Sequence, residues 1–231
     1  MTSTLKAVAL AIGTLALLLG PGGASAHDDD QPRNLDLTAS AHPSDASPDD
    51  SDQAVDVSST WRRTVRADTT ALSSTTCDGC HADATTLQVL YVNHSHDVAV
   101  DNAAVAWSQC AGCGGTALSV QVVVLVDGRR VKADNRALAT NAACDRCNTA
   151  ALAYQLVVVS PDRSRLSKGA VQDLRDWVAA QSEALRAPAA SSRRLRGHRP
   201  SARAERAADT LEGLVNDDLG SRTRELDVQQ R

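Results

Sequence analysis

Three short stretches decide the fold: Cys77-Asp-Gly-Cys80, Cys110-Ala-Gly-Cys113 and Cys144-Asp-Arg-Cys147. They contain all six cysteines of the 231-residue chain and follow one another at intervals of 33 and 34 residues. A constant interval of this length is typical of proteins built from stacked structural repeats. Each C-x-x-C unit is therefore the centre of one repeat.

Polar residues recur at fixed positions on either side of the C-x-x-C units. Each unit is preceded by Asp followed by Thr or Asn, and Gln stands eight residues after its second cysteine. The six polar positions are Thr69, Gln88, Asn102, Gln121, Asn135 and Gln155. We expect them to form a structural polar rung, because an unpaired buried amide costs about 1–3 kcal/mol. A ligand-binding role for the same side chains is the alternative.

Each repeat predicts two β-strands joined at the cysteines. In the second repeat, residues 116–126 are rich in β-branched Val, which favours a strand buried on both faces, and the many Ala residues allow close packing of layers. The Gly in the first two turns tolerates positive φ, as tight hairpins require. We therefore predict a mainly β fold of three hairpins with C-x-x-C tips, forming one antiparallel sheet, a sandwich or a solenoid. The extra residue before Cys144 predicts a β-bulge within residues 135–143.

The first 26 residues have the pattern of a secretory signal peptide. Lys6 provides the positive charge, residues 7–19 are apolar, and residues 24–26 are an A-x-A cleavage site. The apolar stretch is too short to cross a membrane as a helix. The pattern predicts a secreted, extracellular protein with no transmembrane segment after cleavage, in an environment where disulfides persist.

A β domain at residues 61–166 is followed by a helix at residues 167–187. Ser167 is a suitable N-cap, and apolar residues then recur with helical spacing. These apolar residues are Val171, Leu174, Trp177, Val178 and Leu185. We expect this amphipathic helix to close the open end of the sheet, where a fourth repeat would begin.

Two charged segments flank these parts of the chain. Residues 27–60 contain nine Asp against a single Arg33, and residues 188–231 contain an Arg-rich stretch followed by an acidic one. Both segments are predicted to be disordered, because they contain too little apolar surface to offset the entropy of ordering. The Arg-rich stretch could contact an anionic polymer, but it lacks interleaved aromatic residues, so we expect no nucleic acid partner.

The order N-x-A-x-A, C-x-x-C and A-x-x-x-Q resembles repeat units found in secreted proteins of actinobacteria. The resemblance covers residues 66–185, with Thr69 in place of Asn in the first unit. It implies export and a repeat architecture, and no reaction. The residues that match best are Asn102, Ala104, Ala106, Cys110, Cys113 and Gln121.

The cysteines can pair within or between units. Within a unit they flank a two-residue turn, which brings the Cα atoms inside the bridging range of about 4.4–6.8 Å. Loop entropy gives such a bridge about 2 kcal/mol, and a bridge between units such as Cys80–Cys110 about 4 kcal/mol. Repetition favours the local pairing, because each unit then satisfies its own cysteines.

Three other uses of the cysteines remain open. C-x-x-C is the active-site spacing of thiol–disulfide oxidoreductases, although these place it at a helix N-terminus. Two C-x-x-C units can bind zinc, with His81, His94 or His96 available to a third. Cys77 to His81 also matches the C-x-x-C-H haem attachment motif, although the repeat places Gly114 and Asn148 at the position of His81.

The sequence contains no Ser-His-Asp spacing, phosphate loop or zinc-hydrolase motif. We therefore expect a non-catalytic, disulfide-stabilised surface or interaction module, with no cofactor or metal. A cell-envelope polymer or protein is the partner that export suggests. A thiol–disulfide oxidoreductase and a zinc- or haem-binding protein are the alternative functions.

Overall fold

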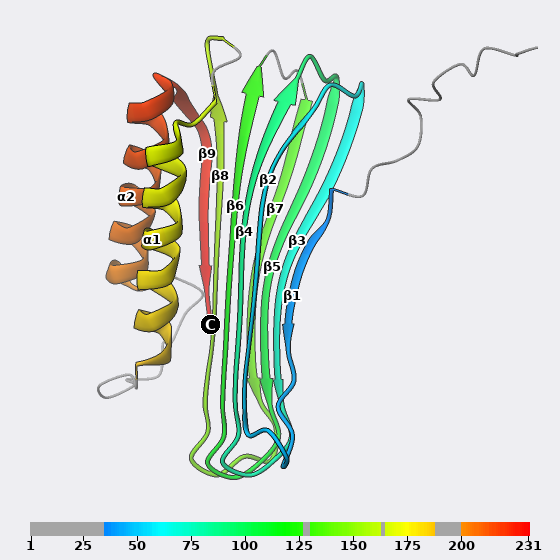
Figure 1. The fold of residues 1–231 in the computed structure, drawn as a ribbon, viewed down its shortest axis with the longest axis vertical. Helices are drawn as coiled ribbons and strands as arrows, with labels where there is room; N and C mark the ends of the chain where they lie inside the picture. Colours follow the sequence, from blue (N-terminus) through cyan, green and yellow to red (C-terminus); the bar gives the residue numbers. More distant parts are fainter. Residues whose placement is uncertain (1–34, 127–129, 163–164, 188–199) are drawn as a thin grey trace, which may run out of the picture. The chain divides into compact units, whose positions relative to one another are not determined.

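Eight parallel strands wind into a β-solenoid of four coils in the computed structural model (Figure 1). The structure describes residues 35–126, 130–162, 165–187 and 200–231, so the predicted signal peptide lies outside the described residues. Each coil consists of an odd-numbered strand followed by an even-numbered strand. The strands of the coils are β1 (Leu37–Ala41), β2 (Asp49–Thr60), β3 (Thr64–Thr75), β4 (His81–Asn93), β5 (Asp97–Ser108), β6 (Gly114–Val126), β7 (Arg130–Asn141) and β8 (Asn148–Val159).

The strands form two sheets that face each other across a thin interior. The four-stranded sheet has the order β1-β3-β5-β7, and the five-stranded sheet has the order β2-β4-β6-β8-β9. Neighbouring coils pair in parallel without a register shift, so that Asn102 lies beside Thr69 and Asn135. Repeated positions therefore form straight rows across each sheet.

The prediction of antiparallel hairpins is wrong, and the solenoid alternative is correct. The two strands that flank a C-x-x-C turn belong to different sheets, and each hydrogen-bonds to the equivalent strand of the next coil. The sequence pattern could not separate these arrangements, because alternating apolar residues suit both of them. Parallel pairing at this repeat length gives each of the two central coils a neighbour on both sides and buries both faces of the central β6 strand.

The interior of the solenoid contains two apolar layers with a polar layer between them. Small side chains fill the half that is nearer the cysteines, where Ala71, Ala84, Ala104 and Ala117 are buried. Val and Leu fill the other half. The Ala-lined face expected from the sequence thus permits the close approach of two sheets.

Two helices and a ninth strand follow the coils, and both helices contact the five-stranded sheet (Figure 1). The predicted helix is confirmed as α1 (Lys168–Arg186), whose N-cap Ser167 accepts a hydrogen bond from the Ala170 N–H. It packs on the outer face of β4, β6 and β8, and therefore does not close the open end as expected. The free edge of β8 is instead covered by β9 (Arg222–Gln230), which runs antiparallel to it.

The C-terminal segment is ordered over its described part, which corrects the prediction of a disordered tail. Residues 200–231 form α2 (Ala202–Leu219) and β9. Leu211 and Val215 of α2 are fully buried against α1 and the sheet, and Asp218 accepts hydrogen bonds from Ser167. These few apolar residues recur with helical spacing and so form one buried face, which the overall composition of the segment does not indicate.

The acidic segment is also ordered over its described part, as the first coil of the solenoid. Asp50 and Asp52 face inward on β2, and their carboxylates accept hydrogen bonds of 2.6 Å from the backbone N–H groups of His42 and Ser40. The predicted disorder is wrong here because these carboxylates pair with backbone donors at the end of the solenoid, where no further coil is described. From composition alone, these residues are predicted to be disordered.

The extra residue of the third repeat lies outside the strand ladder, so the predicted β-bulge is wrong. β5 and β7 remain in register from Asp97 and Arg130 to Ser108 and Asn141. The additional length is taken up between Asn141 and Cys144, where Ala143 has φ 49°. A loop absorbs an insertion at lower cost than a sheet whose register is fixed by buried side chains.

Candidate functional site

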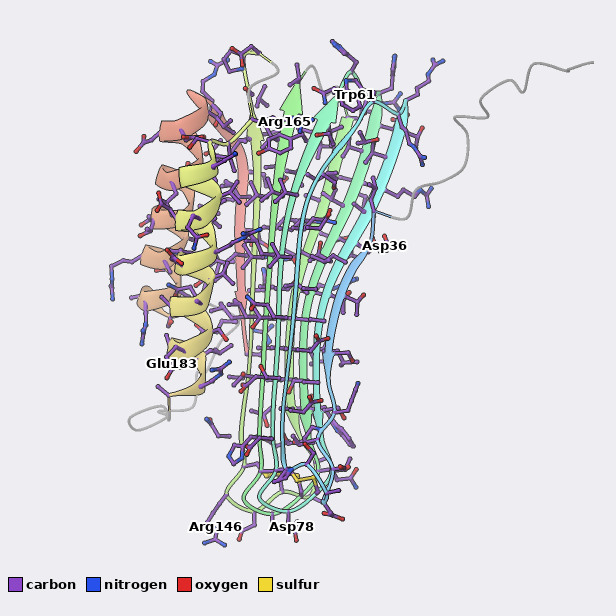
Figure 2. The ribbon with its side chains drawn as sticks, viewed as in Figure 1. Asp36, Trp61, Asp78, Arg146, Arg165 and Glu183 are labelled. Atoms are coloured by element: carbon purple, nitrogen blue, oxygen red, sulfur yellow. A yellow bond between two sulfur atoms is a disulfide. The ribbon has the colours of Figure 1, made fainter. Side chains whose placement is uncertain are left out.

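The six cysteines form three disulfides stacked at one end of the solenoid, each within its own C-x-x-C unit. The Cα–Cα distances are 5.5, 5.9 and 5.8 Å, inside the range that disulfides require. The local pairing is confirmed, and each bridge joins the two sheets at the tip of a coil. Figure 2 shows Asp78 and Arg146, which lie within the first and third C-x-x-C units, at this end of the molecule.

Backbone hydrogen bonds hold the three tips against one another. Gly79 N–H donates to the Ala111 carbonyl at 2.9 Å, and Gly112 N–H donates to the Asp145 carbonyl at 2.7 Å. Both glycines have positive φ, as predicted, and the equivalent Arg146 has φ 57°. The third tip therefore adopts a left-handed conformation without the glycine that makes it inexpensive.

The third disulfide differs from the other two in exposure and in its sulfur contacts. Cys80 and Cys113 are each 1% exposed, whereas Cys144 and Cys147 are half-buried. Cys113 Sγ lies 3.3 Å from Cys147 Sγ and 3.8 Å from Cys144 Sγ. A thiol from solution could therefore reach the third bridge more readily than the others.

The sulfur positions also bear on the zinc and haem hypotheses. One sulfur from each of Cys113, Cys144 and Cys147 lies within 4.8 Å of the others, a spacing that could suit a metal if the bridges were reduced. In the structure all six cysteines are in disulfides, whereas zinc binds thiolates and haem attachment consumes thiols. His81 lies 3.7 Å from Asp49 on the neighbouring strand (Nδ1 to Oδ1), and both side chains are exposed.

The three predicted Gln residues form a ladder through the interior. Gln155 Nε2 donates to Gln121 Oε1 at 2.7 Å, and Gln121 Nε2 donates to Gln88 Oε1 at 2.9 Å. Thr69 Oγ1 also donates to Gln88 Oε1, across the interior, at 2.9 Å. All four side chains are buried, so the ladder satisfies polar groups that would otherwise be costly.

The Asn residues pair along the stack as well, and not with Gln across it. Asn102 Nδ2 donates to Asn135 Oδ1 at 2.8 Å, and Ser119 Oγ donates to Asn102 Oδ1 at 2.6 Å. Asn135 Nδ2 reaches the backbone carbonyl of Asp227 on β9 at 2.9 Å. The predicted polar positions are thus connected mainly along the stack, in one row of Asn and one row of Gln.

The first coil is a repeat that the cysteine pattern could not reveal. Asp45 and Pro48 occupy the places of Cys77 and Cys80. The Pro48 carbonyl accepts a hydrogen bond from the His81 N–H, just as the Cys80 carbonyl accepts one from the Gly114 N–H of the next coil. A signal was nevertheless present, because Asp-Leu-Thr-Ala at 36–39 repeats Asp-Thr-Thr-Ala at 68–71. The Gln row also continues to Asp56 and Asp227 at its two ends.

The outer face of the four-stranded sheet presents its side chains in straight rows. One row is Arg66, Ala99 and Lys132, and the next is carboxylates. The carboxylate row is Asp68, Asp101 and Asp134. Within this row, burial raises the pKa of Asp68 and the carboxylates of Asp36 and Asp101 raise it further, against the opposing effect of Arg136 and Arg66.

Nearer the cysteines, the same face carries an apolar row of Leu72, Val105 and Leu138. Leu138 is 54% exposed, and Leu72 and Val105 are half-buried. Trp107 lies on the same face two residues beyond Val105. This row was not predicted from the sequence, although its three residues occupy the same position of the three repeats and an alignment of the repeats would identify them.

No family model, curated protein or solved structure matches the sequence. Three disulfides are typical of proteins in an oxidising, extracytoplasmic environment. Neither described helix is both long and apolar enough to span a membrane.

Proposed function

We propose that the chain is a secreted, non-catalytic interaction module whose disulfide-closed solenoid presents the outer face of its four-stranded sheet to a cell-envelope polymer or protein. Export is supported by the signal-peptide pattern, by the resemblance to secreted actinobacterial proteins and by the three disulfides.

One observation carries the proposal: the helices lie against one sheet only. α1 and α2 contact strands of the five-stranded sheet, and among the described elements neither helix lies against β1, β3, β5 or β7. The uncovered face displays an apolar row that ends in Leu138, at 54% exposure, beside ordered rows of charge. An exposed apolar patch with a polar rim marks an interaction surface.

The face is tested by sedimentation with isolated cell walls and with exported proteins. Leu138→Asp places a charge in the apolar row and is expected to abolish binding. Val57→Asp is the matched control, because Val57 is 42% exposed on β2 of the other sheet. Equal binding by wild type and Leu138→Asp would exclude this face as the interaction surface.

Thiol–disulfide exchange is a second candidate, which the exposure of the third bridge favours. An external thiolate would attack one sulfur of Cys144–Cys147, form a mixed disulfide with it and release the other sulfur as a thiolate. The test is reduction of insulin by a small dithiol in the presence of the protein. A rate that falls to the uncatalysed value in Cys144→Ser/Cys147→Ser would favour catalysis over the interaction module.

A further inference from the structure

A basic hollow of about 460 Å³ lies where β3, β5 and β7 begin, at the end of the solenoid away from the disulfides. Among the described residues that line it, Asp97 is the only carboxylate, and this side chain pairs with Arg130 at 3.1 Å. The described part of the lining thus has four cationic side chains against one carboxylate, in a chain of net charge −4. The cations are Arg66, Arg130, Lys132 and Arg224.

The repeat shapes this hollow through one small residue. Arg66, Ala99 and Lys132 occupy one row of the sheet, and the methyl group of Ala99 leaves space between the two long side chains. Strands in a sheet are about 4.8 Å apart, so the backbones that carry the two cations are about 10 Å apart. That separation leaves room for a phosphate-sized group over Ala99.

Arg224 reaches the hollow from the other sheet because of an irregularity in β9. Val157 pairs with Glu225 and Val158 pairs with Thr223, so Arg224 is the extra residue at this register shift. A β-bulge changes the direction of a side chain. The bulge therefore brings a cation from the five-stranded sheet to residues of the four-stranded sheet.

Carboxylates limit where an anion could lie. The row of Asp68, Asp101 and Asp134 crosses the same strands two residues farther along, and Lys132 Nζ lies 3.8 Å from Asp134. This row repels anions from the middle of the face. An anionic ligand is thus directed to the strand beginnings, where the cations predominate.

We propose that this hollow binds phosphate groups of a multivalent anion. The assignment rests on the proposed function, for which it names the chemistry of a partner. Three of the four cations are Arg, whose planar donors match phosphate oxygens in pairs. The site is open to solvent and screened by salt, so several phosphates on one molecule are needed for useful affinity.

The test is calorimetric titration of the full mature chain with tripolyphosphate at low and moderate salt. Wild type is expected to bind, more weakly as salt rises. Arg66→Gln/Lys132→Gln is expected to lower the affinity about tenfold or more. Ala99→Glu places a negative charge between Arg66 and Lys132 and is expected to lower the affinity at least as much. Lys168→Gln/Arg175→Gln removes the same charge from the exposed face of α1 and should leave the affinity within about twofold.

Three outcomes would overturn the assignment. The first is no binding of tripolyphosphate by wild type. The second is a loss of affinity in the α1 control as large as in Arg66→Gln/Lys132→Gln. The third is binding of poly-glutamate as tight as that of tripolyphosphate, which would indicate recognition of charge without phosphate. A second copy of the chain is excluded as the occupant if the protein remains monomeric in sedimentation at low salt. Failure here leaves the Leu138→Asp result intact, so the two proposals fail separately.

Discussion

The two sheets of the solenoid are built from the same repeat but meet different surroundings. Every strand from β4 to β8 in the five-stranded sheet is covered on its outer face by the helices, where Leu87, Val122 and Leu156 are buried. The equivalent face of the four-stranded sheet carries Asp, Arg and Lys in rows, and no described helix covers it. The difference shows that one repeat can provide a covered face and an uncovered face, because each strand contributes to one sheet only.

The largest expected effect separates the covered sheet from the uncovered one. Leu174→Ala removes a fully buried side chain of α1 and should lower the free energy of unfolding by about 2–5 kcal/mol. Leu138→Ala on the uncovered face should change it by less than about 0.5 kcal/mol. Urea denaturation measures both, and comparable losses would mean that the two faces are equally structural.

Next in size is the polar ladder between the sheets. Gln121→Leu removes one of the two donors to Gln88 Oε1 and leaves Gln155 Nε2 with only a 3.4 Å contact to the Val100 carbonyl. We expect a loss of about 2–3 kcal/mol in urea denaturation, in spite of the more apolar side chain. Asn135→Leu, at a half-buried position, should cost less. A stabilised Gln121→Leu protein would show that the ladder is dispensable.

The disulfides tie the two sheets together at the coil tips. Cys144→Ser/Cys147→Ser opens the third tip and should cost about 2 kcal/mol, as expected for a short loop. Thermal unfolding under oxidising conditions should show this loss relative to wild type. In reductant, where the wild-type bridge is also open, the variant and wild type should be equally stable. A loss that persists in reductant would come from packing and not from the bridge.

A gain in stability is expected at the same tip. Arg146 has φ 57°, whereas the equivalent residues of the first two tips are glycines. Arg146→Gly should raise the free energy of unfolding by about 1 kcal/mol, because glycine adopts this conformation without a steric penalty. Asp145→Gly, at the preceding position, serves as the control and should not stabilise the protein.

The smallest effect concerns the carboxylate row on the uncovered sheet. The pKa of Asp68 is raised from its ordinary value of 3.8, so the fold favours the protonated form. Its contribution to stability is present below the ordinary pKa and is lost as pH rises through the raised one. Asp68→Asn should therefore raise the melting temperature slightly at about pH 7 and have no effect at about pH 3. Asp209→Asn on α2 should show neither change.

The sequence predicted a repeat, local disulfides, a mainly β fold and α1. The repeat follows from the cysteine spacing, and the other three follow from residues close together in the sequence. Strand pairing did not follow, since hairpins and coils place the same alternation of apolar residues at the same positions. The first coil was missed because the repeat was defined by its cysteines, which Asp45 and Pro48 replace.

The sequence by itself determined the length of the repeat and the polar positions such as Gln121, and it favoured the local pairing of the cysteines. All of these depend on neighbours within one coil or on a pattern that recurs from coil to coil. Only the tertiary structure decided which strands pair, that α1 covers one sheet, and that Arg66, Lys132 and Arg224 surround one hollow. These features depend on contacts between residues tens of positions apart, whose energies are set by the packing of whole sheets and helices.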